Sequence, residues 1–208
     1  MTTSHSLAAA LTAGLLMAGS LTTEATLTVT DFSNGGSGNL YTASGSGSQV
    51  ILDNNYSGVA YSMNFGASGL NISDISVALS FSGGYNGDLY AYLSHGSTLV
   101  QLLTPNSDVT GAGISITFHE SGYAVFPSSG TPSGDYTLSG LSGFNTADPN
   151  GTWVLFFADQ SPGDTSTLTS FSIGITAVPE PVNVALGTFG GLFAVAGLVN
   201  LVRRWKAA

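Results

Sequence analysis

Ile75-Ser76-Val77-Ala78-Leu79-Ser80-Phe81 alternates large apolar residues with small ones, and this period of two predicts a half-buried β-strand. The same alternation recurs along most of the chain. It is found in Val59–Phe65, Leu89–Leu93, Leu99–Leu103, Ile114–Phe118, Trp153–Phe157 and Phe171–Ile175. Turns rich in Gly, Asn, Ser and Pro separate these segments, and no amphipathic helix is evident between the termini. The sequence therefore predicts an all-β fold, an antiparallel β-sandwich or jelly roll.

The C-terminal region has the features of a membrane span. Residues Val182–Val202 are almost wholly apolar and long enough to cross a bilayer as a helix. The three basic residues of the chain, Arg203, Arg204 and Lys206, follow directly. Because basic residues hold their end of a span in the cytoplasm, the sequence predicts that everything before Val178 lies outside.

The N-terminus also predicts export. Leu7–Met17 has the length of a signal-peptide core and is too short to span a membrane, so we expect cleavage after Ala25. No Lys or Arg precedes this run, which departs from the usual signal. The expected organisation is a signal peptide at 1–25, a Gly/Ser-rich lead-in with room for a first strand at 26–47, the β-sandwich at 48–177 and a C-terminal signal at 178–208, with its helix at 182–202.

Val178-Pro179-Glu180-Pro181, followed by the apolar run and by Arg203-Arg204, resembles the PEP-CTERM sorting signal of bacterial proteins processed by exosortases. The resemblance implies that an exosortase in the membrane cuts near these prolines, and that the mature protein reaches the cell envelope or extracellular matrix. It also implies a link to exopolysaccharide. The two prolines are expected to keep the segment extended and open to a peptidase. The alternative is a plain single-pass anchor with a proline-containing stalk.

Asp53–Val59, Ile72–Ile75, Gly87-Asp88-Leu89, Asn150–Trp153 and Asp159–Leu168 follow one another within residues 48–176. Their order resembles the P domain found behind subtilisin-like proprotein convertases. Ser94-His95-Gly96 and Phe171 depart from the pattern of that family. The resemblance implies a P-domain-like sandwich with a stabilising role, and this chain has no room for the protease itself.

The chain has twelve acidic residues, no cysteine and no Lys or Arg before Arg203. A nucleic-acid partner is therefore excluded, because binding to phosphates depends on Lys and Arg. Without disulfides, an exported domain must rely on apolar burial or on a metal. Asp53, Asp159 and Asp164 lie in Gly/Asn-rich loops, and carboxylates gathered from loops are ligands for Ca²⁺. The alternative is that these residues only cap turns.

Tyr90 and Tyr92 share one face of a predicted strand, where they could stack against sugar rings. The alternative is that this face packs inside the sandwich or is ordinary strand surface. No catalytic arrangement is evident, because no serine lies in a Gly-x-Ser-x-Gly motif. His95 is expected in a turn, and His119-Glu120 is expected to face solvent at a strand end. We expect no enzymatic activity.

These features together predict an exported, non-catalytic protein that is anchored in the membrane as a precursor. Its mature form is expected at the cell envelope or in the extracellular matrix, with a structural or adhesive role linked to exopolysaccharide. Two alternatives stay open: a Ca²⁺-dependent glycan-binding module, and an accessory domain for a separately encoded protease.

Overall fold

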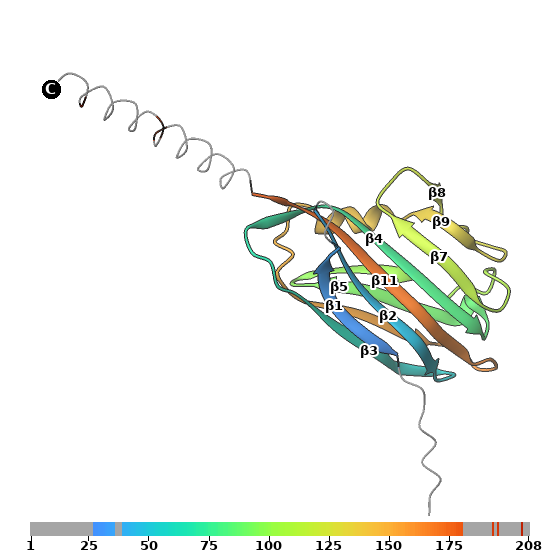
Figure 1. The fold of residues 1–208 in the computed structure, drawn as a ribbon. Coiled ribbons are helices and arrows are strands. Elements are labelled where there is room, and N and C mark those ends of the chain that lie inside the picture. The colour runs from blue at the N-terminus through green and yellow to red at the C-terminus, as the bar shows by residue number, and fades with distance from the viewer. Residues whose placement is uncertain (1–26, 36–38, 181–192, 194, 196–204, 206–208) are drawn as a thin grey trace, which may run out of the picture.

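The computed structural model describes residues 27–35, 39–180, 193, 195 and 205. The strands of these residues form two β-sheets that pack face to face, and two short 3₁₀ helices lie in the connections between strands (Figure 1). They are β1 (Thr28–Asn34), β2 (Leu40–Ile51), β3 (Asn55–Phe65), β4 (Leu70–Gly83), η1 (Asn86–Asp88), β5 (Leu89–His95), β6 (Thr98–Leu103), β7 (Ile114–His119), β8 (Ala124–Val125), β9 (Ser133–Thr137), η2 (Ser139–Phe144), β10 (Gly151–Asp159) and β11 (Ser166–Pro179). The prediction of an all-β fold is confirmed.

The larger sheet has seven strands in the order β1-β2-β11-β4-β7-β9-β8, and the smaller has four in the order β3-β10-β5-β6. Most neighbouring strands are antiparallel, as predicted. The pairs of β9 with β7 and with β8 are parallel, so the prediction of a wholly antiparallel sandwich is wrong at this edge. The chain between β7 and β9 returns to the starting end of β7 before β9 begins, which requires the parallel direction.

The seven-stranded sheet includes the segment expected to be a lead-in. β2 pairs with β1 on one side and with β11 on the other, and Ala43 on β2 is fully buried. Among the described residues, the sandwich therefore extends back to Thr28, and the lead-in, in which a first strand was expected to have room, contributes β1 and most of β2. Gly/Ser-rich sequence is compatible with this position because small residues on β2 leave room for the Phe171 ring, which lies against Gly45.

The core lies between the two sheets and follows the predicted alternation. On β4, Ile75, Val77, Leu79 and Phe81 are buried, whereas the serines and alanine between them are partly exposed. Phe81 on the larger sheet contacts Phe157 on the smaller one, with ring centroids 5.4 Å apart. Burial of apolar surface between the faces is the main source of stability in a chain without disulfides.

Trp153 on β10 is the largest fully buried side chain of the described residues. Its Nε1 donates a hydrogen bond to the carbonyl oxygen of Pro149 at 2.9 Å. The rings of Phe144 and Phe32 pack against it at centroid distances of 5.0 and 5.8 Å. The indole therefore joins β1, η2 and β10 in one cluster.

His95 was expected in a turn but is the last residue of β5. Its ring stacks on the Trp153 ring at 4.2 Å, nearly parallel at 4°. Nδ1 lies 3.0 Å from the carbonyl oxygen of Thr152, and Nε2 lies 2.9 Å from that of Asp148. Both ring nitrogens thus contact backbone oxygens, so this side chain serves the fold.

Glu120 does not face solvent as expected. Its Oε1 accepts a hydrogen bond from the N–H of Ile75 at 3.0 Å, and its Oε2 accepts one from Nδ2 of Asn145 at 2.8 Å. Glu120 therefore connects β4 to the end of η2. His119 pairs instead with Asp135, whose Oδ1 lies 3.0 Å from Nε2 of the histidine.

Among the described residues, no helix has the length and apolar character needed to span a membrane. The predicted signal peptide at 1–25 and the predicted span at 182–202 lie outside the described residues. Pro181, Arg203 and Arg204 of the predicted sorting signal lie outside them as well.

Candidate functional site

An aromatic patch lies on the outer face of the four-stranded sheet and consists of Tyr90, Tyr92 and Phe156. The rings of Tyr92 and Phe156 stack with their centroids 4.9 Å apart and their planes at 15°. Tyr90 approaches both rings edge-on, at 6.1 Å from Tyr92 and 6.2 Å from Phe156. All three side chains are half-buried, so the predicted placement of the two tyrosines on one outward strand face is observed.

The register of the sheet brings the third ring to this patch. Phe156 on β10 lies directly opposite Tyr92 on β5, and its ring rests against Gly58 on β3. Phe156 was missed because Trp153–Phe157 was predicted as one more alternating strand, although all five of its residues are apolar and no polar residue marks the outward positions. The available signal was its position between two inward residues, Leu155 and Phe157.

The patch offers aromatic carbon and two phenolic hydroxyls. Neither the Tyr90 nor the Tyr92 hydroxyl takes part in a hydrogen bond within the described part of the chain. Rings with a free polar group suit ligands that present both C–H surfaces and hydroxyls. Phe156 stacks on one face of Tyr92, and all three rings stay partly exposed.

Beside the patch, at the end of β10, Asp159 is fully buried. The N–H of Ser161 donates to its Oδ1 at 3.2 Å, while Oδ2 has no hydrogen-bond partner among the described residues. Burial is the largest influence and raises the pKa of this carboxyl. The N–H of Ser161 lowers it, and the negative charges of Asp88 and Asp53 raise it again, so the pKa is raised overall.

The three predicted Ca²⁺ ligands do not come together as a set. Asp53 lies close enough to Asp159 to interact electrostatically, but both its carboxylate oxygens accept the N–H of Gly163 at 3.1 Å. Asp164 is exposed in the following loop. Asp88, which was not predicted as a ligand, is the second acidic neighbour of Asp159. Within residues 27–35 and 39–180, no three acidic or histidine side chains are grouped to hold a metal.

We expect acidification to stabilise the metal-free protein through Asp159. Because folding raises the pKa of this carboxyl, its contribution to stability is fully present below the ordinary Asp value of about 4 and is lost as the pH rises through the folded value. In buffer that contains a chelator, the Asp159→Asn variant should therefore unfold at a higher denaturant concentration than the wild type at pH 7. The difference should shrink toward pH 4. A difference that does not change with pH would contradict this assignment.

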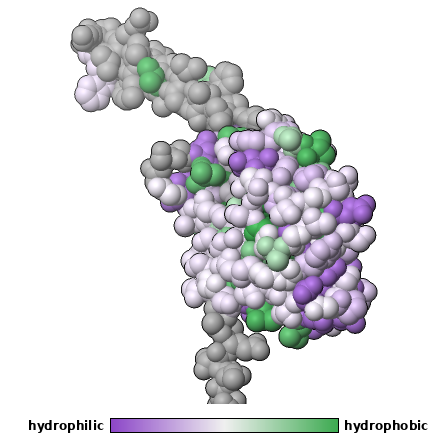
Figure 2. Space-filling view, turned by 90° about the vertical axis from the view of Figure 1, so that its right-hand side faces the viewer, coloured by the Kyte–Doolittle hydropathy of each residue, from purple (hydrophilic) through white to green (hydrophobic). Residues whose placement is uncertain are grey.

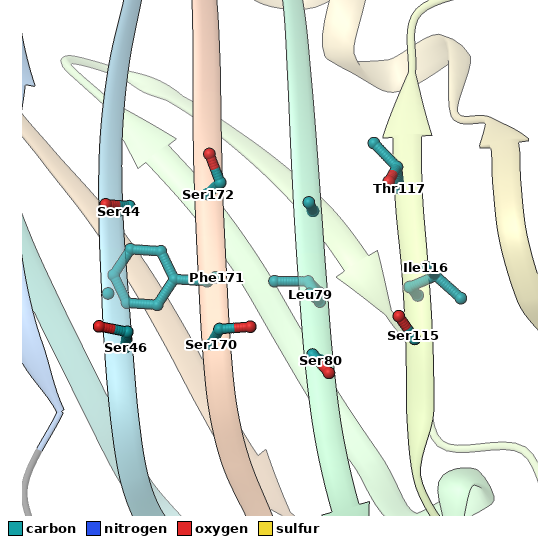
Figure 3. A pocket seen from close by; sticks show the side chains of 12 residues that line it. Ser44, Ser46, Leu79, Ser80, Ser115, Ile116, Thr117, Ser170, Phe171 and Ser172 are labelled. Carbon is teal, nitrogen blue, oxygen red and sulfur yellow. The ribbon is translucent and has the colours of Figure 1, made fainter.

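The outer face of the seven-stranded sheet carries a shallow hollow with a volume of about 380 Å³. It crosses β2, β11, β4 and β7, and Figure 3 shows short serine side chains along these strands. Its polar side chains are hydroxyls, from Ser44, Ser46, Ser80, Ser115, Thr117, Ser170 and Ser172. None of the lining side chains ionises near neutral pH, so the hollow offers hydrogen bonds but no general acid or base.

Val178, Pro179 and Glu180 of the predicted processing segment are extended, but they are bonded to neighbouring backbone rather than free. Val178 pairs with Asn71 and Pro179 pairs with Leu70, both on β4. The N–H of Glu180 donates to the carbonyl oxygen of Gly69 at 3.2 Å. The end of β11 therefore belongs to the sheet, and a peptidase that cuts here must first release it from β4.

No family model matches this chain, and no curated protein matches it. Among solved structures, the serine protease of Aeromonas sobria in complex with its chaperone is similar at a TM-score of 0.42 and 14% identity, over 68% of this chain and 27% of that chain. The serine protease of Aeromonas sobria alone gives a TM-score of 0.39 and 14% identity, over 65% and 27%. This chain thus spans about a quarter of the length of the structures that it matches.

Proposed function

We propose that this is an exported, non-catalytic protein of the cell envelope or extracellular matrix whose P-domain-like sandwich adheres to neutral polysaccharide. The aromatic patch of Tyr90, Tyr92 and Phe156 carries this proposal, because three adjoining rings with two free hydroxyls remain on an outer sheet face. Sorting by an exosortase, through the C-terminal signal, would deliver it there from a membrane-anchored precursor.

The charge of the molecule supports a neutral polysaccharide rather than an anionic one. Residues 27–180 contain no Lys or Arg, so nothing on the sandwich attracts carboxylates or sulfates. Exposed polar groups are largely hydroxyls and amides. Figure 2 shows one side of the molecule, where hydrophobic residues form small separate groups among mostly weakly hydrophilic residues.

The contacts of His95 and His119 support a non-catalytic role. His95 is held between Trp153 and two backbone carbonyls. His119 and Asp135 form a partly exposed pair, but neither lines the hollow of Figure 3. A general acid or base must lie within hydrogen-bond reach of its substrate, and the lining of that hollow contains no titratable side chain.

Polysaccharide binding is tested by affinity electrophoresis of the full-length protein in gels that contain neutral polysaccharides or the exopolysaccharide of the native host. We expect Tyr90→Ala and Tyr92→Ala each to weaken retardation about 10-fold, as the loss of roughly 1.4 kcal/mol of aromatic contact would. Tyr123→Ala is the matched control, since Tyr123 is an exposed tyrosine that stacks on His119 instead.

Equal retardation of all variants, or none of the wild type on any polysaccharide, would remove the adhesive proposal. Loss of retardation in Tyr123→Ala as well would point to a general effect on folding. Thermal unfolding of each variant separates these outcomes.

The sorting proposal has an independent test. Mass spectrometry of the protein recovered from the envelope and medium of its native host should find a C-terminus near Pro179-Glu180-Pro181, without Arg203 and Arg204. Arg203-Arg204 retained in every recovered molecule would instead favour the single-pass anchor. This outcome leaves the polysaccharide proposal untouched.

A further inference from the structure

Three buried side-chain oxygens at one end of the sandwich have no hydrogen-bond partner among the described residues. They are Asn86 Oδ1, Asp159 Oδ2 and Ser166 Oγ, and each has less than 1 Å² of exposed surface. Their residues are 4%, 0% and 1% exposed. Buried polar atoms almost always have a hydrogen-bond partner. Three buried oxygens without one in the same region are therefore candidate ligands for a bound ion.

The topology places these oxygens at the same end. β10 ends at Asp159 and β11 begins at Ser166, so the loop 160–165 crosses there from one sheet to the other. Asn86 lies in η1, within the crossing from β4 to β5. Asp159 pairs with Leu89, the first residue of β5, and Ser166 pairs with Gly83, the last residue of β4.

Short contacts hold the two crossings together. The N–H of Gln160 donates to the carbonyl oxygen of Asp88 at 3.0 Å. Gly84 passes so close to Ser166 that an added Cβ would overlap its Oγ. The three oxygens thus belong to segments that touch one another and have little freedom to turn elsewhere.

Asn86 has a fixed orientation. Its Nδ2 donates to the carbonyl oxygens of Thr110 and Gly113, at 3.0 and 3.2 Å. Both donor hydrogens of the amide are therefore used, and Oδ1 is the atom left without a partner. Reversing the amide would break two hydrogen bonds, so the orphaned oxygen is a stable feature of this end.

The charge at this end also lacks a counterpart from the protein. Asp159 is buried near the negative charges of Asp88 and Asp53. No Lys or Arg exists between residues 27 and 180 to neutralise them. A buried carboxylate without a cationic partner is strongly unfavourable, so a cation from solution would relieve both the charge and the unpaired oxygens.

We propose that Asp159 Oδ2, Asn86 Oδ1 and Ser166 Oγ form a Ca²⁺ site, with the carboxylate of Asp159 as its anionic ligand. Ca²⁺ takes oxygen ligands of mixed kind from loops, in irregular geometry, at 2.3–2.6 Å. Backbone carbonyls of the two crossings would complete its shell. The site differs from the predicted set of Asp53, Asp159 and Asp164, and it does not depend on the polysaccharide proposal.

The test uses the full-length protein in mild detergent, stripped with a chelator and dialysed. Thermal unfolding is followed through the fluorescence of buried Trp153, without metal, with 1 mM CaCl₂ and with 1 mM MgCl₂. We expect Ca²⁺ to raise the melting temperature by about 5–10 °C, as saturation of one site at about 100 times its Kd would, and Mg²⁺ to raise it less. Calorimetric titration should give one Ca²⁺ per chain.

Three variants locate the site. Asp159→Asn keeps the side-chain shape and should abolish the Ca²⁺ shift, while melting no lower than the wild type in chelator. Asp164→Asn removes the same charge from the neighbouring loop, where the side chain is exposed, and should keep the full shift. Ser166→Ala should bind Ca²⁺ more weakly, which provides a second reading if Asp159→Asn does not fold.

A wild type that shows neither a Ca²⁺ shift nor heat of binding overturns the proposal. So does a shift that survives in Asp159→Asn, because the ion would then bind elsewhere. A shift lost in Asp164→Asn but kept in Ser166→Ala would also contradict it, and would favour the exposed loop as the site.

Discussion

Replacement of Trp153 by Ala is expected to lower the free energy of unfolding by about 4 kcal/mol, within the range of large-to-small changes at buried tryptophans. The indole is fully buried and touches Phe144 and Phe32, so its removal leaves a cavity lined from three elements. It also removes the surface on which His95 stacks and the donor to Pro149. A domain of this size has only about 5–15 kcal/mol of stability, so the loss is large.

Urea unfolding followed by far-ultraviolet circular dichroism measures this loss without the Trp153 fluorescence. Trp153→Phe keeps most of the ring contacts and should lose roughly half as much. A change below about 1 kcal/mol for Trp153→Ala would show that the cluster can collapse around the gap, against the tight packing described here.

Gly58→Ala is expected to cost about 3 kcal/mol. Gly58 has a φ of +53°, which L-residues adopt at a cost of roughly 1–2 kcal/mol. A Cβ there would also overlap the carbonyl oxygen of Phe157 and the ring of Phe156. Since the Phe157 oxygen is backbone, the clash cannot be relieved by a rotamer change alone.

Gly96→Ala is the matched control for this effect. Gly96 has nearly the same φ, +58°, but no atom lies within 4 Å of the position that a Cβ would take. It should therefore cost only the backbone term of roughly 1–2 kcal/mol. Equal destabilisation of both variants in urea would mean that the contact between Gly58 and Phe156 has no energetic weight, and that the aromatic patch is more loosely held than described.

The sequence predicted the strands whose side chains alternate most clearly. Ile75–Phe81 became the middle of β4 because an apolar face of period two can be buried only against a second sheet. Ser133–Thr137 was not predicted as a strand, because it has no apolar alternation. It is held by ladder contacts to β7 and by the Tyr136 hydroxyl, which donates to the carbonyl oxygen of Ser133 at 2.9 Å.

The candidate sites were predictable only in part, and for the same reason. Tyr90 and Tyr92 are two residues apart, so local periodicity alone places them on one face. Phe156 joins them through the register between β5 and β10, and Asp88 approaches Asp159 through the same pairing. Register depends on the whole sheet, and no local pattern in the sequence specifies it.

β11 lies between β2 and β4 in the seven-stranded sheet, and it is the strand from which the chain leaves the described domain. A mechanical pull applied beyond Pro179 and directed along this strand would load both of its hydrogen-bond ladders in shear. Many bonds must then break together, whereas an edge strand peeled from its end loses them one at a time. Resistance to forced unfolding is governed by the unfolding rate, and that rate is low when many hydrogen bonds must break in the first step. Attachment through a central strand therefore suits a domain that must stay folded under tension.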